Sequence, residues 1–83
     1  MRYMVIETFR TGCRASVYER FREKGRMLPE GLRYLDSWVE KDGNRCFQFM
    51  ETDTPKLFES WMQAWSDLVS FEIVELEERD NPA

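Results

Sequence analysis

The segment Gly31–Thr52 constrains the fold most, because it predicts two strands joined by a tight turn. Asp42-Gly43 separates two runs rich in aromatic and aliphatic residues, which is among the strongest local signals of a β-hairpin. A type I′ turn here requires positive φ at both central residues. The resulting register pairs Glu40 with Arg45, Val39 with Cys46, Trp38 with Phe47, Ser37 with Gln48, Asp36 with Phe49, Leu35 with Met50, and Tyr34 with Glu51.

The other elements follow from periodicity and from helix-capping residues. Residues 2–10 alternate as a strand, and a helix is expected from Cys13 or Arg14 to Lys24, capped by Thr11 or Gly12 and ended by Gly25. Thr54-Pro55 starts a second helix, whose apolar stripe continues at three- to four-residue spacing to residue 68. Residues 69–77 alternate as a final strand.

This order of elements, βαββαβ, predicts an α+β, ferredoxin-like fold. Right-handed crossovers place both helices on one face of a four-stranded antiparallel sheet. Residues 1–77 are expected to form this single domain, and residues 78–83 a polar C-terminal tail.

Composition narrows the function classes. The net charge is −4, which argues against a general binder of nucleic acid or of anionic membranes, and no apolar run is long enough to span a bilayer. The chain has no His and two cysteines without metal-ligand spacing, so Ser-His and Cys-His nucleophiles are excluded. We expect no metal or other cofactor, and a cytoplasmic protein with reduced thiols and no signal peptide.

Aromatic residues exceed what a small core can enclose, with three Trp, three Tyr and six Phe in 83 residues. Compact, mostly uncharged residues such as Met4, Ile6, Leu35 and Met50 are expected to face the helices. The opposite, open face would then carry rings and carboxylates, as ligand pocket or dimer interface: Glu7, Phe9, Tyr34, Asp36, Trp38, Phe47, Phe49 and Glu51, together with Tyr3 and Val5. Such an apolar face predicts a homodimer packed sheet to sheet, enclosing a cavity for a small molecule.

Several segments resemble an uncharacterised family of small bacterial proteins, a domain of unknown function. They are MVIETF, KGRMLPEGL, the SW of the second strand, CFQFME and the W…W-DLV-FEI ending, so the resemblance covers about residues 1–75. It implies a fold similar to the dimeric α+β barrels, which include antibiotic-biosynthesis-type monooxygenases, muconolactone isomerases and stress-responsive barrel proteins. It implies no catalytic mechanism. Relatives with isomerase or dehydratase activity place a His or a similar polar group in the barrel, and this chain has no His.

Glu7, Asp36 and Glu51 are candidate acids or bases, because a carboxyl desolvated among rings has a raised pKa. The alternative is a solvated rim position, paired with a nearby arginine. Arg26 and Arg33 could clamp a carboxylate ligand, or pair on the surface with Glu30 or Glu23.

Other residues have structural alternatives to a functional role. Cys13, at a helix N-terminus between two arginines, is either a reactive thiolate or an inert small residue. Cys46 fits the core, and Trp61 and Trp65 fit core packing better than a cofactor platform. The basic residues of the first helix fit a solvated surface.

Three functions remain open. The first is a barrel protein that binds a small, partly apolar molecule without chemistry of its own. The second is a cofactor-independent enzyme of monooxygenase or isomerase type, with one of the three carboxylates as base and Tyr34 or Trp38 as ring partner. The third is an RNA-binding module, because Arg45–Met50 has the alternating aromatic pattern of an RNA-recognition strand, with Tyr3 beside it. The carboxylates on that face argue against RNA.

Overall fold

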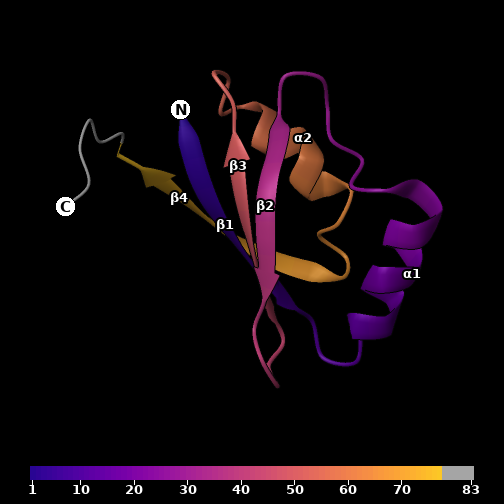
Figure 1. Ribbon diagram of the computed structural model, residues 1–83. Helices are drawn as coiled ribbons and strands as arrows, with labels where there is room; N and C mark the ends of the chain where they lie inside the picture. The colour runs from indigo at the N-terminus through magenta and orange to yellow at the C-terminus, as the bar shows by residue number, and fades with distance from the viewer. Residues whose placement is uncertain (78–83) are drawn as a thin grey trace.

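The computed structural model describes residues 1–77 and has the predicted order of elements (Figure 1). The elements are β1 (Arg2–Phe9), α1 (Arg14–Lys24), β2 (Arg33–Val39), β3 (Arg45–Glu51), α2 (Leu57–Gln63) and β4 (Val69–Leu76). The strands form one antiparallel sheet in the order β2-β3-β1-β4. The α+β, ferredoxin-like fold is therefore confirmed, while the predicted tail lies outside the described residues.

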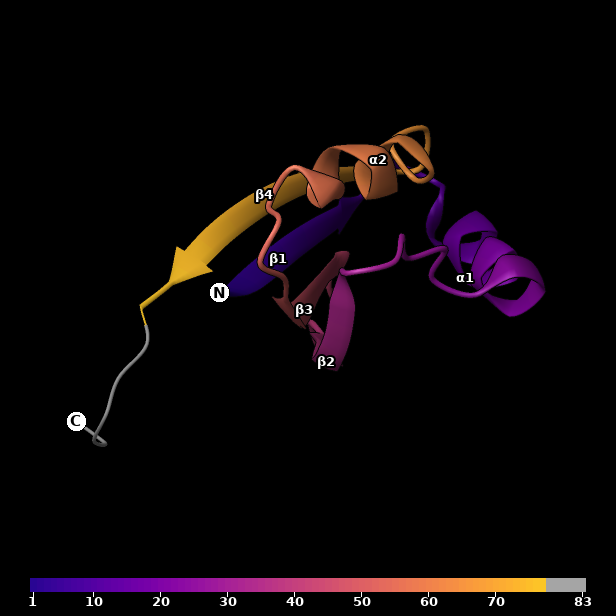
Figure 2. The ribbon, with the colours of Figure 1, turned by 90° about the horizontal axis from the view of Figure 1, so that it is seen from above.

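The two helices cover the same face of the sheet but pack differently (Figure 2). α2 lies over β1 and β4, where Phe58 meets Tyr3 edge to face at 5.0 Å between ring centroids and Trp61 contacts Phe71. These rings form the core with Val5, Met50 and Trp65. α1 contributes no fully buried side chain. No helix within residues 1–77 is long and apolar enough to cross a membrane.

The hairpin has the predicted register near its turn but a different turn conformation. Trp38 lies opposite Phe47, and the backbone N–H of Glu40 donates to the carbonyl of Arg45 at 2.8 Å. Of the two central residues, only Asp42 has a positive φ, of 58°. The turn is therefore not type I′, although the alternating strands on either side still fix the pairing.

A bulge in β2 changes the register farther from the turn. Tyr34 pairs with Met50 and Asp36 pairs with Phe49, so Leu35 is an extra residue without a partner. The predicted pairs Leu35–Met50 and Tyr34–Glu51 are wrong, because one inserted residue reverses the side to which the preceding side chains point. Tyr34 consequently lies on the helix side, and Leu35 is exposed.

The prediction for β1 has the two faces interchanged. Tyr3, Val5, Glu7 and Phe9 are buried beneath the helices, whereas the intervening residues, including Met4 and Ile6, lie on the open face. Met4 and Ile6 were expected beneath the helices because they are compact and uncharged, whereas the opposite side of the strand carries Glu7. In the structure, the rings of Tyr3 and Phe9 fill the space beneath the helices. The side-chain amide of Gln48 donates a hydrogen bond to the Glu7 carboxyl.

Both helices have the expected positions, with differences at their ends. The N-cap of α1 is Cys13 rather than Thr11 or Gly12, and its side chain makes no capping hydrogen bond. α2 begins at Leu57, with Lys56 as its N-cap, rather than at Thr54-Pro55, and it ends at Gln63, well before residue 68. Beyond that point the N–H groups of Ala64 and Trp65 bond to carbonyls three residues earlier, which tightens the chain into turns that lead to β4.

Candidate functional site

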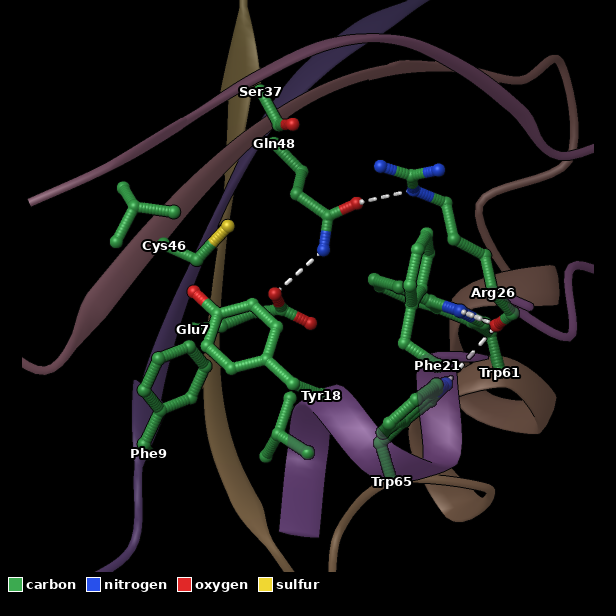
Figure 3. A pocket seen from close by; sticks show the side chains of 12 residues that line it. Glu7, Phe9, Tyr18, Phe21, Arg26, Ser37, Cys46, Gln48, Trp61 and Trp65 are labelled. Atoms are coloured by element: carbon green, nitrogen blue, oxygen red, sulfur yellow. Dashed lines mark hydrogen bonds between the residues drawn. The ribbon is translucent and has the colours of Figure 1, made fainter. Parts of the chain in front are cut away.

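A pocket of about 170 Å³ lies between α1 and the helix-covered face of the sheet (Figure 3). Its polar groups come from all three neighbouring strands and from the segment after α1, and rings form much of the remaining wall. The lining residues are Glu7, Phe9, Val17, Tyr18, Phe21, Arg26, Ser37, Val39, Cys46, Gln48, Trp61 and Trp65.

Glu7 is the buried carboxyl of this pocket, with 7% of its surface exposed. The side-chain amide of Gln48, opposite Val5 on the neighbouring strand, donates to Glu7 Oε1 at 2.5 Å. No Lys or Arg lies within ion-pair distance of Glu7 in the described part of the chain. Burial therefore raises the pKa of Glu7, against the smaller lowering effects of Gln48, Cys46 and Arg26.

Cys46 lies beside Glu7, as its partner across the β1–β3 pair. Burial, and then the neighbouring carboxylate, raise the pKa of the Cys46 thiol to about 12. The thiol therefore stays protonated at neutral pH and is a poor nucleophile. The predicted inward position of Cys46 is confirmed, on the wall of a pocket.

Arg26 closes one end of the pocket with its guanidinium group. The group lies 3.5 Å from the ring centroid of Tyr34 and 4.9 Å from that of Phe21, and its Nε donates to Gln48 Oε1 at 3.3 Å. Within residues 1–77, its two Nη atoms make no hydrogen bond or ion pair. A planar guanidinium held in this way presents a free fork of donors.

The backbone of Arg26 is held by the two tryptophans. The indole N–H groups of Trp61 and Trp65 both donate to the Arg26 carbonyl, at 2.9 and 3.0 Å (Figure 3). Both tryptophans are buried, so their predicted role in core packing is confirmed. They also fix the position from which the guanidinium reaches into the pocket.

Arginines, rather than a buried stripe, hold α1 above the pocket. Arg14 donates to the carbonyl of Gly43 at 2.8 Å, and Arg20 makes a bidentate pair with Asp67 at 2.8 and 2.7 Å. Arg14 is exposed, as predicted, whereas Arg20 is half-buried, so the predicted solvated position is wrong for Arg20. The apolar residues Val17 and Phe21 of α1 border the pocket, and Val17 also packs against the core.

The predicted site residues divide between two faces. Glu7 and Phe9 line the α1 pocket, and Tyr34 supports the Arg26 guanidinium from the same side. The prediction that these three lie on the open face is wrong. Glu7 and Phe9 point to the helix side because the two faces of β1 are interchanged, and Tyr34 does so because of the bulge in β2. The residues that do lie on the open face are Asp36, Trp38, Phe47, Phe49 and Glu51.

Asp36 and Glu51 do not share the environment of Glu7. Asp36 is exposed, and Glu51 accepts from Arg33 at 2.7 Å. The bonds from Arg33, and then from Arg2, lower the pKa of Glu51. A desolvated carboxyl is therefore found at only one of the three predicted positions. The prediction that Arg26 and Arg33 together clamp a carboxylate ligand is also wrong, because Arg33 pairs with Glu51 on the other face.

Sequence reasoning missed Gln48 and Tyr18 as members of the site. A signal for Gln48 was present, since it alternates with Cys46 and Met50 on the strand face assigned to the helices. A polar amide on an inward face requires a buried partner. The RNA hypothesis loses its supporting ring, because Tyr3 is buried beneath α2 and not beside Phe47 and Phe49.

No group of three Cys, Asp or Glu side chains in residues 1–77 is arranged to hold a metal ion. Comparison with known proteins found one family match, to a model described as a domain of unknown function, DUF3303, over residues 1–76. No curated protein and no solved structure matches the sequence. Since the family model spans nearly the whole chain, which has the fold described above, the protein belongs to the DUF3303 family.

Proposed function

We propose that this protein binds a small, partly apolar molecule in the pocket beneath α1. The observation that carries the proposal is the combination of a buried carboxyl, Glu7, and a stacked guanidinium, Arg26, in one ring-lined space. Apolar walls with a few convergent polar groups are typical of small-molecule sites. A protein that needed only stability would fill this space with side chains.

The size of the pocket limits the ligand. Its volume of about 170 Å³ is below the ~300–1,000 Å³ of sites for drug-sized ligands. A single ring with a short polar arm fits that space better than a nucleotide or a larger cofactor. Tyr18, Trp61 and Trp65 supply ring faces and edges for the apolar part.

Tryptophan fluorescence tests this proposal directly, because Trp61 and Trp65 line the pocket. The third tryptophan, Trp38, lies on the open face and is replaced by Phe to remove its background signal. We expect saturable fluorescence changes when this protein is titrated with one-ring probes, namely benzoate, benzoylformate and benzyl alcohol. If none of the three probes produces a saturable change, the proposal is wrong.

A matched pair of variants on α1 shows where the probes bind. Val17 lines the pocket and is half-buried, so Val17→Phe should fill the space and abolish the fluorescence change. Ala15 is exposed on the same helix, and Ala15→Phe should leave the titration unchanged. Equal titrations for the two variants would place the probes elsewhere on the protein.

We also propose that a second copy of the chain covers the open face of the sheet. Half-buried apolar residues run across β1 and β3, including Ile6, Phe47 and Phe49, and Trp38 beside them is 51% exposed. Arg45 and Arg2 lie over two of these rings, at 5.3 and 5.8 Å from their centroids. At the margin of this face, Arg33 pairs with Glu51 and Arg45 with Glu40, so an apolar centre has a polar rim, as is typical of subunit interfaces.

Sedimentation velocity tests the dimer. We expect a dimer for the wild type and a monomer for Phe49→Asp, which introduces a charge among the apolar residues of the open face. Ser60→Asp, on an exposed position of α2, is the control and should remain dimeric. A wild-type protein that sediments as a monomer at micromolar concentration would contradict the proposal.

The open face also bears on the RNA hypothesis. Asp36, Glu51 and Glu72 lie on this face, among the rings that would have to stack on bases. Carboxylates there repel phosphates, so we favour a second protein copy over RNA as its partner.

A further inference from the structure

Glu7 is an unusual residue for the middle of a core strand. Its neighbours on the same side of β1 are Val5 and Phe9, which are both buried and apolar. A carboxyl at this position has to be desolvated, and the amide of Gln48, the thiol of Cys46 and the charge of Arg26 offset only part of that cost. Within residues 1–77, no ion pair explains its presence. Carboxyls in such surroundings are concentrated at sites of proton transfer.

Gln48 links this carboxyl to the guanidinium of Arg26. Its Nε2 donates to Glu7 and its Oε1 accepts from Arg26, so both ends of the amide are oriented (Figure 3). The carboxyl and the Arg26 guanidinium are therefore separated by one side-chain amide and its two hydrogen bonds, of 2.5 and 3.3 Å. A ligand carboxylate bound to Arg26 would bring the next few atoms of the ligand to Glu7.

We infer that Glu7 transfers protons to and from a carbon atom of an enolisable 2-oxo acid whose carboxylate is bound by Arg26. This inference rests on the proposed ligand-binding function and names the class of ligand. The guanidinium, already stacked on Tyr34, offers the bidentate donors that a carboxylate accepts best. The rings of Tyr18 and Trp65 would contact an apolar or aromatic end.

The proposed step needs no metal, oxidant or cofactor. The Glu7 carboxylate takes a proton from the carbon next to the oxo group, so that a C–H bond breaks and an O–H bond forms on Glu7. The electron pair of the C–H bond moves to the oxo oxygen and gives an enolate. The proton then returns to that oxygen or to the carbon, which restores the carboxylate and gives the enol or the keto form. Cys46 is not the base, because its thiol stays protonated.

Deuterium exchange of phenylpyruvate tests the inference. This probe has one ring, an oxo acid arm and an enolisable methylene group, whose proton NMR signal decays in D₂O as the hydrogens exchange. We expect the wild-type protein to accelerate the decay over the buffer rate. Glu7→Gln should reduce the protein-dependent rate by about 10²–10⁴-fold, the usual contribution of a general base.

Binding is measured in parallel with benzoylformate, which has the same oxo acid arm but no enolisable hydrogen. For Glu7→Gln, whose glutamine oxygen can still accept from Gln48, this measurement separates a loss of proton transfer from a loss of binding. Arg26→Gln should raise the concentration for half-saturation by about 10- to 100-fold, as expected for the loss of bonds to a charged group. Glu59→Gln, at an exposed position of α2 that does not line the pocket, is the matched control and should change neither binding nor exchange.

The outcomes separate the two proposals. If benzoylformate binds but phenylpyruvate does not exchange, or exchanges equally fast with Glu7→Gln, the inference is wrong and the binding function stands. If benzyl alcohol binds and the two carboxylates do not, the role of Arg26 is wrong while binding again stands. If no probe binds, both proposals are wrong. Exchange that depends on both Glu7 and Arg26, in a protein that remains folded by circular dichroism, supports the inference.

Discussion

Replacing Tyr3 by Phe should stabilise this protein, although the residue lies in the core. The Tyr3 ring is 3% exposed and packs edge to face on Phe58. Its hydroxyl oxygen is buried, and no group in residues 1–77 accepts or donates a hydrogen bond to it. Burial, and then the nearby Glu75, raise the pKa of Tyr3, but Glu75 is not placed to accept a hydrogen bond.

The magnitude follows from the fate of the hydroxyl group. In the unfolded chain water hydrates it, and folding removes that water without supplying a partner. An unsatisfied buried polar group costs about 1–3 kcal/mol. Attraction of the hydroxyl dipole to Glu75 offsets part of this cost, so we expect Tyr3→Phe to raise the free energy of unfolding by about 1 kcal/mol. For a domain of this size, that corresponds to a rise in Tm of about 4–8 °C.

Urea denaturation at pH 7, followed by tryptophan fluorescence, measures the change. Tyr34→Phe is the matched control, because the Tyr34 hydroxyl has a partner, Ser37 Oγ, at 2.6 Å. The same loss of an oxygen atom should therefore destabilise the protein there, by about 0.5–1.5 kcal/mol. The reasoning is refuted if Tyr3→Phe destabilises the protein, or if the two variants change stability in the same direction with unchanged m-values.

Three further predictions concern other buried or constrained positions. Burial raises the folded pKa of Glu7 above its ordinary 4.5, so the stability that this shift contributes is present below pH 4.5 and is lost as pH rises through the folded pKa. Glu7→Gln should therefore gain stability relative to the wild type as the pH of urea denaturation rises from 4 to 8, and parallel pH curves would contradict this. The Cys46 thiol, with a pKa of about 12, should react with iodoacetamide at pH 7.5 far more slowly in the folded than in the urea-unfolded protein, as mass spectrometry of its peptide would show; equal rates would exclude the protected thiol. Gly31 has a φ of +96°, and an added Cβ would lie 3.1 Å from Leu57 Cδ1, so Gly31→Ala should cost about 1 kcal/mol or more in urea denaturation, whereas an unchanged midpoint would show that the strain is relieved.

The sequence by itself determined the architecture of this protein. Alternation in residues 2–10, the Asp-Gly turn and the Thr54-Pro55 pair are local signals, and they are sufficient to order the six elements, although α2 begins only at Leu57. Pairing near the turn, such as Trp38 with Phe47, was also predictable, because a short loop leaves little freedom of register. Glu7 was predicted as a candidate base on the open face, whereas the structure places it in the pocket beneath α1, among rings of other segments.

Only the tertiary structure decided which side of each strand faces the helices. In β1, Tyr3 and Phe9 fill space beneath the helices, and their burial outweighs the cost of burying Glu7, to which Gln48 donates a hydrogen bond. In β2, the bulge at Leu35 turns Tyr34 toward the helices, where it supports Arg26. Neither choice has a local signature, because the side on which a side chain is buried depends on the volume and polar partners supplied by segments distant in the sequence.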